Sequence, residues 1–144
     1  MSRQCVQMDV EFNAPVEQVF AVLSDHEALG KVLGADFTRI RDGQEHVNGV
    51  GSVRRIGGPP LMSFEETVTA FEPNRLVEYT VSRGSPIKNH LGRMVFSEHA
   101  GKTHLHYTIE FEPRLPLPFS GLLIATGLKR MMLRGLRRFA RQYN

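Results

Sequence analysis

The sequence predicts an α+β fold in which one antiparallel sheet packs against one long C-terminal helix. Between residues 35 and 112, short segments of alternating character are separated by turn residues such as Asp42-Gly43 and Pro73-Asn74. After residue 118 the apolar spacing changes from two to three or four residues and stays so to the end. A sheet with one apolar face must bury it against another element, and the final helix is long enough to cover it.

The first strand is predicted over residues 4–12, because polar and apolar side chains alternate there. Its apolar face consists of Val6, Met8, Val10 and Phe12. Asn13 and Pro15 end the strand, and Pro15 also suits the first turn of a helix.

Two short helices are predicted after the first strand. In the first, the apolar residues fall at i, i+3, i+4 and i+7, which is one face of a helix: Val16, Val19, Phe20 and Leu23. Ser24 and Asp25 can cap a second helix that extends to about Val32 and that Gly30 and Gly34 weaken.

Six further strands complete a predicted set of seven. They are expected at 35–42, 50–56, 61–72, 75–82, 88–98 and 103–112, joined by short turns that make successive strands antiparallel neighbours. The prolines of residues 113–118 then prevent the last strand from continuing.

The last segment, residues 119–144, is predicted to be an amphipathic helix of roughly 35 Å. Its apolar stripe consists of Ala125, Leu128, Met132, Leu136, Phe139 and Tyr143. The opposite face is basic and carries Arg130, Arg134, Arg137 and Arg141.

Length and composition limit the function classes. A chain of 144 residues fits one domain, residues 1–144, and the single cysteine, Cys5, allows neither an internal disulfide nor a cysteine metal cluster. No segment resembles a signal peptide or a membrane span, so a cytoplasmic location is expected. The net charge of +3 is uneven, because residues 119–144 hold six basic side chains and no acidic one.

Over nearly its whole length the chain resembles the polyketide cyclase/dehydrase-like branch of the Bet v 1-like/START superfamily, also called SRPBCC. The segments that carry the resemblance are APVEQVFAVLSD, GVGSVRRI, FEETVTAFEPNRLVEYTV, GSPIKNHLGRMVFSE and GKTHLHYTIEFEP, in this order and spacing. The resemblance implies a helix-grip fold, in which a curved seven-stranded antiparallel sheet surrounds the long C-terminal helix and encloses a cavity. The two short helices would support the open end of the grip.

Strand alternation predicts which side chains face that cavity. The inward sets are Val50, Ser52, Arg54 and Ile56; Met62, Phe64, Glu66, Val68 and Ala70; Val77, Tyr79 and Val81; His90, Met94 and Phe96, with Gly92 leaving room between them; and Leu105, Tyr107, Ile109 and Phe111. From these and the helix stripe, the expected ligand-binding residues are Arg54, Phe64, Glu66, Val68, Tyr79, His90, Met94, Phe96, Tyr107, Ile109, Leu128 and Met132.

Glu66 stands out as a carboxylate on an otherwise apolar face, where an unpaired charge is costly to bury. Arg54, on the preceding strand, is its expected partner. Three interpretations stay open for Glu66: an ion pair that fixes the sheet, a polar anchor for a ligand, or a group that transfers protons. The aromatic rings of Tyr79, His90 and Tyr107 belong either to the core or to the ligand contacts.

Other chemistries lack a signal. No serine lies in a nucleophile motif, and no catalytic residue is assigned. His104 and His106 share one strand face, but alternation turns them outward and no third ligand is evident, so no metal is expected. The glycine pairs at 49–51 and 57–58 precede no helix, so they predict turns rather than a nucleotide site, and no cofactor is expected.

Three function classes remain, and the first is favoured. It is the binding or carriage of a small hydrophobic or amphipathic molecule of lipid, quinone, isoprenoid or polyketide type. The second is a polyketide cyclase/dehydratase-type lyase or isomerase that uses Glu66, Arg54 and a tyrosine. The third is contact of the basic helix face with an anionic membrane or a partner, which is not favoured because the helix buries its apolar side on the sheet. Nucleic acid is not an expected partner, and the chain is expected to be a monomer or a homodimer.

Overall fold

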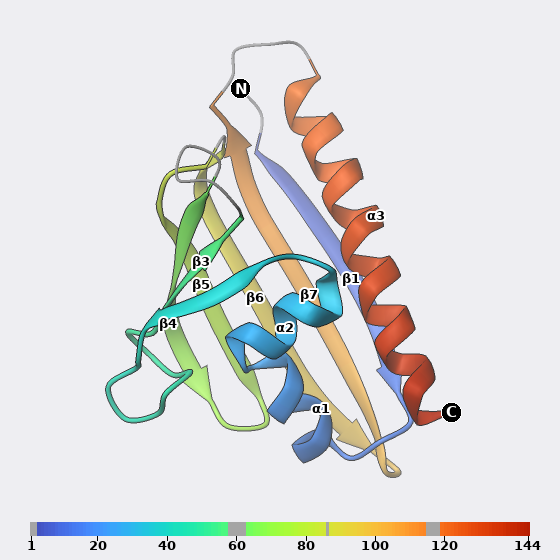
Figure 1. Cartoon of the computed structure of the whole chain (residues 1–144). Helices are drawn as coiled ribbons and strands as arrows, with labels where there is room; N and C mark the ends of the chain where they lie inside the picture. The colour runs from blue at the N-terminus through green and yellow to red at the C-terminus, as the bar shows by residue number, and fades with distance from the viewer. Residues whose placement is uncertain (1–2, 58–62, 86, 115–118) are drawn as a thin grey trace.

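The computed structural model describes residues 3–57, 63–85, 87–114 and 119–144. Along the chain lie β1 (Gln4–Phe12), α1 (Val16–Leu23), α2 (His26–Leu33), β2 (Phe37–Arg41), β3 (Val53–Ile56), β4 (Phe64–Glu72), β5 (Leu76–Arg83), β6 (Ile87–His99), β7 (Lys102–Pro113), α3 (Ser120–Ala140) and the 3₁₀ turn η2 (Arg141–Tyr143). The seven strands form one antiparallel sheet in the order β1-β7-β6-β5-β4-β3-β2. Helix α3 runs beside β1, and α1 and α2 lie together near one end of the sheet (Figure 1). The predicted helix-grip fold is therefore confirmed.

The local signals explain where the short helices begin and end. The Asp25 carboxylate accepts a hydrogen bond from the Ala28 backbone N–H at 2.9 Å and so caps α2. Gly34 ends α2 in the left-handed conformation, with φ of 72°, which glycine adopts without strain. The Asp25 cap was predicted from the sequence, whereas Gly34 was expected to weaken the helix and instead ends it.

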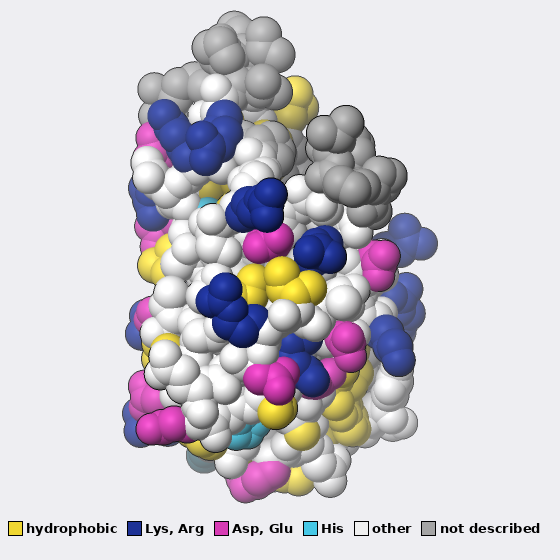
Figure 2. Space-filling view, turned by 60° about the vertical axis from the view of Figure 1, so that its left-hand side comes forward, with side chains coloured by type: hydrophobic (Ala, Val, Ile, Leu, Met, Phe, Trp, Pro, Cys, Tyr) yellow, Lys and Arg dark blue, Asp and Glu magenta, His cyan; other side chains and the backbone are white. Residues whose placement is uncertain are grey.

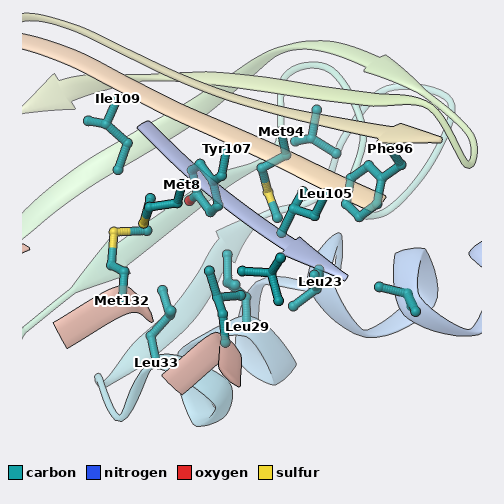
Figure 3. Close-up of a cluster of buried hydrophobic side chains, with 14 of the residues drawn as sticks. Met8, Leu23, Leu29, Leu33, Met94, Phe96, Leu105, Tyr107, Ile109 and Met132 are labelled. Carbon is teal, nitrogen blue, oxygen red and sulfur yellow. The ribbon is translucent and has the colours of Figure 1, made fainter. Parts of the chain in front are cut away.

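The core lies between the sheet and the helices. Side chains of the sheet, including Met94, Phe96 and Leu105, point toward Leu23 and Leu29 of the short helices (Figure 3). The predicted stripe of α3 is confirmed: Met132, Leu136 and Phe139 are buried, and Ala125, Leu128 and Tyr143 pack partly buried against the core. Helix α3 spans 21 residues, or about 32 Å.

A glycine brings α2 and α3 close together. A side-chain carbon at Gly135 would collide with the backbone carbonyl oxygen of Val32, so only glycine permits this approach. The Arg138 guanidinium also donates to the Val32 carbonyl oxygen at 3.2 Å. The two helices therefore meet at a fixed place along α3.

The prediction for Val50 was wrong. The third strand begins at Val53 rather than at residue 50, and Val50 is exposed. The preceding residues form a turn in which the Ser52 N–H donates to the Gly49 carbonyl oxygen and Gly51 takes a φ of 91°. Ser52, Arg54 and Ile56 are buried as predicted.

The prediction for Ala70 was also wrong, because β4 contains a bulge. The register with β5 shifts between Val68 and Ala70, so Ala70 lies opposite Glu78. Phe71 takes the inward place, opposite Val77 and 5.5 Å from the Phe20 ring centroid. Met62, also predicted to face inward, lies outside the described residues.

Candidate ligand-binding cavity

A cavity of about 120 Å³ lies between the sheet, the segment from the end of α2 to β2, and the middle of α3. Nine of the twelve expected ligand-binding residues line it: Arg54, Phe64, Glu66, Tyr79, His90, Tyr107, Ile109, Leu128 and Met132. The other lining residues are Leu33, Ala35, Phe37, Ile56, Ile87 and Met131. Most of these side chains are apolar, and the polar groups lie on the sheet.

Val68, Met94 and Phe96 do not line this cavity. All three are buried in the hydrophobic core, and the Phe96 ring lies 5.0 Å from that of Phe20 on α1. Strand alternation correctly places them on the inner face. It does not show how far along a strand the cavity extends, and the short helices fill the space next to Met94 and Phe96 (Figure 3).

A buried ion pair forms the polar centre of the cavity wall. Arg54 and Glu66 lie opposite each other on β3 and β4, with 3% and 7% of their surfaces exposed. The Arg54 Nε donates to Glu66 Oε1 at 2.8 Å, and Nη2 lies 2.7 Å from the same oxygen. Burial lowers the pKa of Arg54, but the Glu66 charge, the two nearby tyrosines and the hydrogen bond to Glu66 together outweigh it, so the net pKa is raised and the guanidinium stays charged. The expected pairing of Glu66 with Arg54 is confirmed.

His90 faces the second oxygen of Glu66. Its Nδ1 accepts a hydrogen bond from the Val81 backbone N–H at 3.1 Å, so in the neutral ring the proton sits on Nε2. Nε2 lies 3.9 Å from Glu66 Oε2, which is beyond direct hydrogen-bond distance. Burial lowers the pKa of His90, so the ring is neutral at pH 7 and presents an N–H next to a carboxylate oxygen.

His26, which the sequence analysis did not identify as a site residue, contacts Arg54 on the side away from Glu66. Arg54 Nη1 donates to His26 Nδ1 at 3.3 Å, and His26 Nε2 lies 2.8 Å from Ser52 Oγ. Burial, together with the positive charges of Arg54 and Arg39, lowers the pKa of His26 to about 3. Since His26 Nδ1 accepts from Arg54, the neutral ring carries its proton on Nε2 and donates it to Ser52 Oγ, so this serine–histidine contact is not a nucleophilic pair.

The two tyrosines add a pair of neutral hydroxyls to the same wall. The hydroxyl groups of Tyr79 and Tyr107 hydrogen-bond to each other. Burial raises the pKa of Tyr79 well above its usual value and that of Tyr107 to about 12. The Arg54 guanidinium carbon lies 4.3 Å from the centroid of the Tyr79 ring, a cation–π contact. The room that Gly92 was predicted to leave is occupied by this ring.

The outer face of the sheet is different in character. His104 and His106 point outward, as predicted, and each ring lies 2.9 Å from Asp9 Oδ1. Within the described ranges, no group of three His, Cys, Asp or Glu side chains is placed to hold a metal ion. On the face shown in Figure 2, Lys and Arg side chains are mixed with Asp and Glu. The acid-free stretch on α3 therefore contrasts with the face shown in Figure 2, where both charges occur.

A sheet that grips a helix around a mostly apolar cavity with a few buried polar groups is the architecture of the START/Bet v 1 class. The chain belongs to the family described as polyketide cyclase / dehydrase and lipid transport, whose model matches residues 3–144. None of the curated proteins compared with the chain matches it significantly.

Solved structures show the same fold at low sequence identity. A START superfamily protein from Mycobacterium smegmatis is 16% identical, with a TM-score of 0.77, and covers 97% of this chain and 99% of its own. A protein from Thermobifida fusca is 17% identical, with a TM-score of 0.77 over 96% and 92% of the two chains. Norcoclaurine synthase from Thalictrum flavum, solved with dopamine and hydroxybenzaldehyde, is 14% identical, with a TM-score of 0.70 over 99% and 89%. Among the described residues, no helix is both long and apolar enough to cross a membrane.

Proposed function

We propose that the protein binds a small hydrophobic or amphipathic molecule in this cavity and carries it without altering it. The observation that supports this most is the contrast within the cavity wall. Apolar side chains from α2, β2, α3 and the sheet surround one compact group of buried polar side chains. Binding pockets use this combination, because apolar contacts supply affinity and a few fixed polar groups orient the ligand.

The polar groups are matched to an oxygen-bearing end of a ligand. Tyr79 and Tyr107 are neutral, so once one hydroxyl donates to the other, the second can donate to a ligand carbonyl or hydroxyl. His90 Nε2 and Glu66 Oε2 lie 3.9 Å apart, so a ligand oxygen placed beside them can reach both, accepting from the first and donating to the second. A hydroxyl group has both capacities.

The size of the cavity favours a compact ligand or the end of a longer chain. Its volume of about 120 Å³ is below the several hundred Å³ of typical ligand pockets. Leu128, Met131 and Met132 of α3 form one wall. Methionine side chains change conformation readily, so this wall can adjust to a larger molecule.

A second candidate is an enzyme of the polyketide cyclase/dehydratase type. The observation that favours it is the placement of a carboxylate, a guanidinium and two neutral tyrosine hydroxyls around one apolar space. In this scheme Glu66 would remove a proton next to a carbonyl group while a tyrosine donates to the developing enolate oxygen. The Arg54 ion pair opposes this role, because a proton taken up by Glu66 would leave the buried Arg54 charge without its partner.

Native mass spectrometry of the intact protein, purified without detergent, tests the binding function, with extraction and identification of any released molecule. Ala35→Leu, which adds three carbons at the cavity wall, should abolish the bound mass. Ala21→Leu makes the same change on an exposed site of α1 and should keep it. Equal occupancy in both variants would contradict the proposal.

A further inference from the structure

A surface groove of about 390 Å³ runs between the end of α2 and α3. Gly34 and Gly135 are among its lining residues, and the two helices approach each other most closely at Gly135, next to the Val32 carbonyl oxygen. Gly127, closer to the start of α3, has no neighbouring atom within 4 Å of the position that a side-chain carbon would take. The groove therefore follows from the close contact between α2 and α3.

The groove adjoins the internal cavity. Leu33 and Met131 line both spaces, so these two side chains form the wall between them. Met131 is 43% exposed, although it also reaches the cavity. Because its unbranched side chain can take several conformations, Met131 can move aside and join the two spaces.

The groove is strongly basic. Arg130, Arg134 and Arg138 line it, and no acidic residue is among its described lining residues. Residues four apart share one face of a helix, so the three guanidinium groups follow one another at intervals of about 6 Å. The hydrogen bond from Arg138 to the Val32 carbonyl oxygen fixes one end of this row.

We propose that this groove binds the anionic head of an amphipathic ligand, a phosphate or carboxylate group, while the apolar part of the same molecule passes between Leu33 and Met131 into the cavity. This inference rests on the proposed binding function and names the chemical class of the ligand. Arginine side chains suit phosphate and carboxylate because their planar groups donate two parallel hydrogen bonds. The cavity accepts the apolar part of the ligand, and the basic groove accepts the charged group, which is costly to bury without a partner.

A matched pair of variants can test the groove. Arg130 and Arg134 line the groove. Arg137 and Arg141 do not line it; they line a second, neighbouring hollow on α3, to which Arg130 and Arg134 also contribute. The double variants Arg130→Gln/Arg134→Gln and Arg137→Gln/Arg141→Gln therefore lose the same charge at different places. All four side chains are exposed, so both variants should fold as the wild type does.

Isothermal titration calorimetry with n-octyl phosphate, 1-octanol and inorganic phosphate, at one ionic strength, separates the contributions of head and chain. We expect wild-type protein to bind octyl phosphate at least tenfold more tightly than octanol. Arg130→Gln/Arg134→Gln should remove most of this preference, and Arg137→Gln/Arg141→Gln should change it less than threefold. Octanol affinity should be the same in all three proteins.

Three results would overturn the inference and leave the proposed binding function standing. Equal affinity for octanol and octyl phosphate in the wild type would show that the groove does not bind the phosphate group of the ligand. Equal losses in the two double variants would show that only the net charge of α3 matters. Inorganic phosphate that binds as tightly as octyl phosphate would indicate a site for free anions. If neither octanol nor octyl phosphate binds, the proposed binding function fails as well.

Discussion

Replacing Glu66 by Gln should destabilise the protein strongly, because it leaves the charge of Arg54 buried without a partner. The Arg54 side chain is 4% exposed and donates to Glu66 through both Nε and Nη2. It also contacts His26 and the rings of Tyr79 and Phe37, which are all neutral and cannot balance its charge. Loss of one partner from a buried ion pair costs about 3–5 kcal/mol. We expect a decrease of this size in the free energy of unfolding, measured by urea denaturation.

The neighbouring carboxylate supplies the control. Glu65 pairs with Arg55 and Arg83 at 3.9 and 3.8 Å, and these arginine side chains are 48% and 80% exposed. Exposed pairs contribute about 0–1 kcal/mol, so Glu65→Gln should be nearly neutral. The double variant Arg54→Met/Glu66→Leu removes both buried charges and should recover most of the lost stability. A loss below about 1 kcal/mol in Glu66→Gln would refute the reasoning, because Arg54 would then have another source of compensation.

Three further predictions concern the core, the pH dependence and the role of Glu66. Leu136→Ala should lower the free energy of unfolding by about 2–5 kcal/mol in denaturant titrations, since Leu136 is fully buried; a negligible loss would contradict the assignment of the α3 stripe. Between pH 7 and pH 5 the unfolded chain protonates His26 at its ordinary pKa of 6.5, whereas the folded protein, with a pKa of about 3, does not. The free energy of unfolding, measured by urea titration at each pH, should therefore fall by about 2 kcal/mol from pH 7 to pH 5. In the variant His26→Gln this decrease should be smaller, and an unchanged decrease would show that His26 is not the group responsible. Under conditions where Glu66→Gln stays folded, a binding protein should change its ligand affinity by about tenfold, or 1.4 kcal/mol, in calorimetry. An enzyme that uses Glu66 as a base should instead keep binding and lose about 10²–10⁴ in turnover of a polyketone substrate.

The period of the strands made much of the cavity wall predictable. Glu66 and Arg54 were expected on the inner face because side chains two apart point the same way, and their pairing follows from adjacent antiparallel strands. The same rule failed at Ala70, because a bulge inserts one residue and reverses the alternation without a clear sequence signal.

Features that depend on tertiary packing were not predictable. His26 begins α2 directly after its capping residue, and nothing in the helical pattern indicates that its ring contacts Arg54. Leu33 and Met131 separate the groove from the cavity only because Gly135 brings α3 against α2. His26 and Arg54 are 28 residues apart in the chain, and Arg138 and Val32 of the contact between α3 and α2 are 106 apart, so a local pattern reveals neither contact.

The fold and the family do not distinguish a binding protein from an enzyme, so the side chains of the site must do so. The helix-grip architecture occurs both in a START superfamily protein and in norcoclaurine synthase, at 16% and 14% identity to this chain. A shared fold does not fix a function, so the polar group around Arg54 and Glu66 decides the question.

The most direct test of the proposed binding function is a methyl NMR titration of the protein, labelled with ¹³C at its methionine methyl groups, with 1-octanol. Met131 and Met132 line the cavity, whereas Met94 is buried in the core away from it. Binding in the cavity should shift the Met131 and Met132 signals in a saturable way and leave Met94 nearly unchanged. Saturable binding that leaves Met132 unchanged, or no saturable shift at all, would contradict the proposal that this cavity is the binding site.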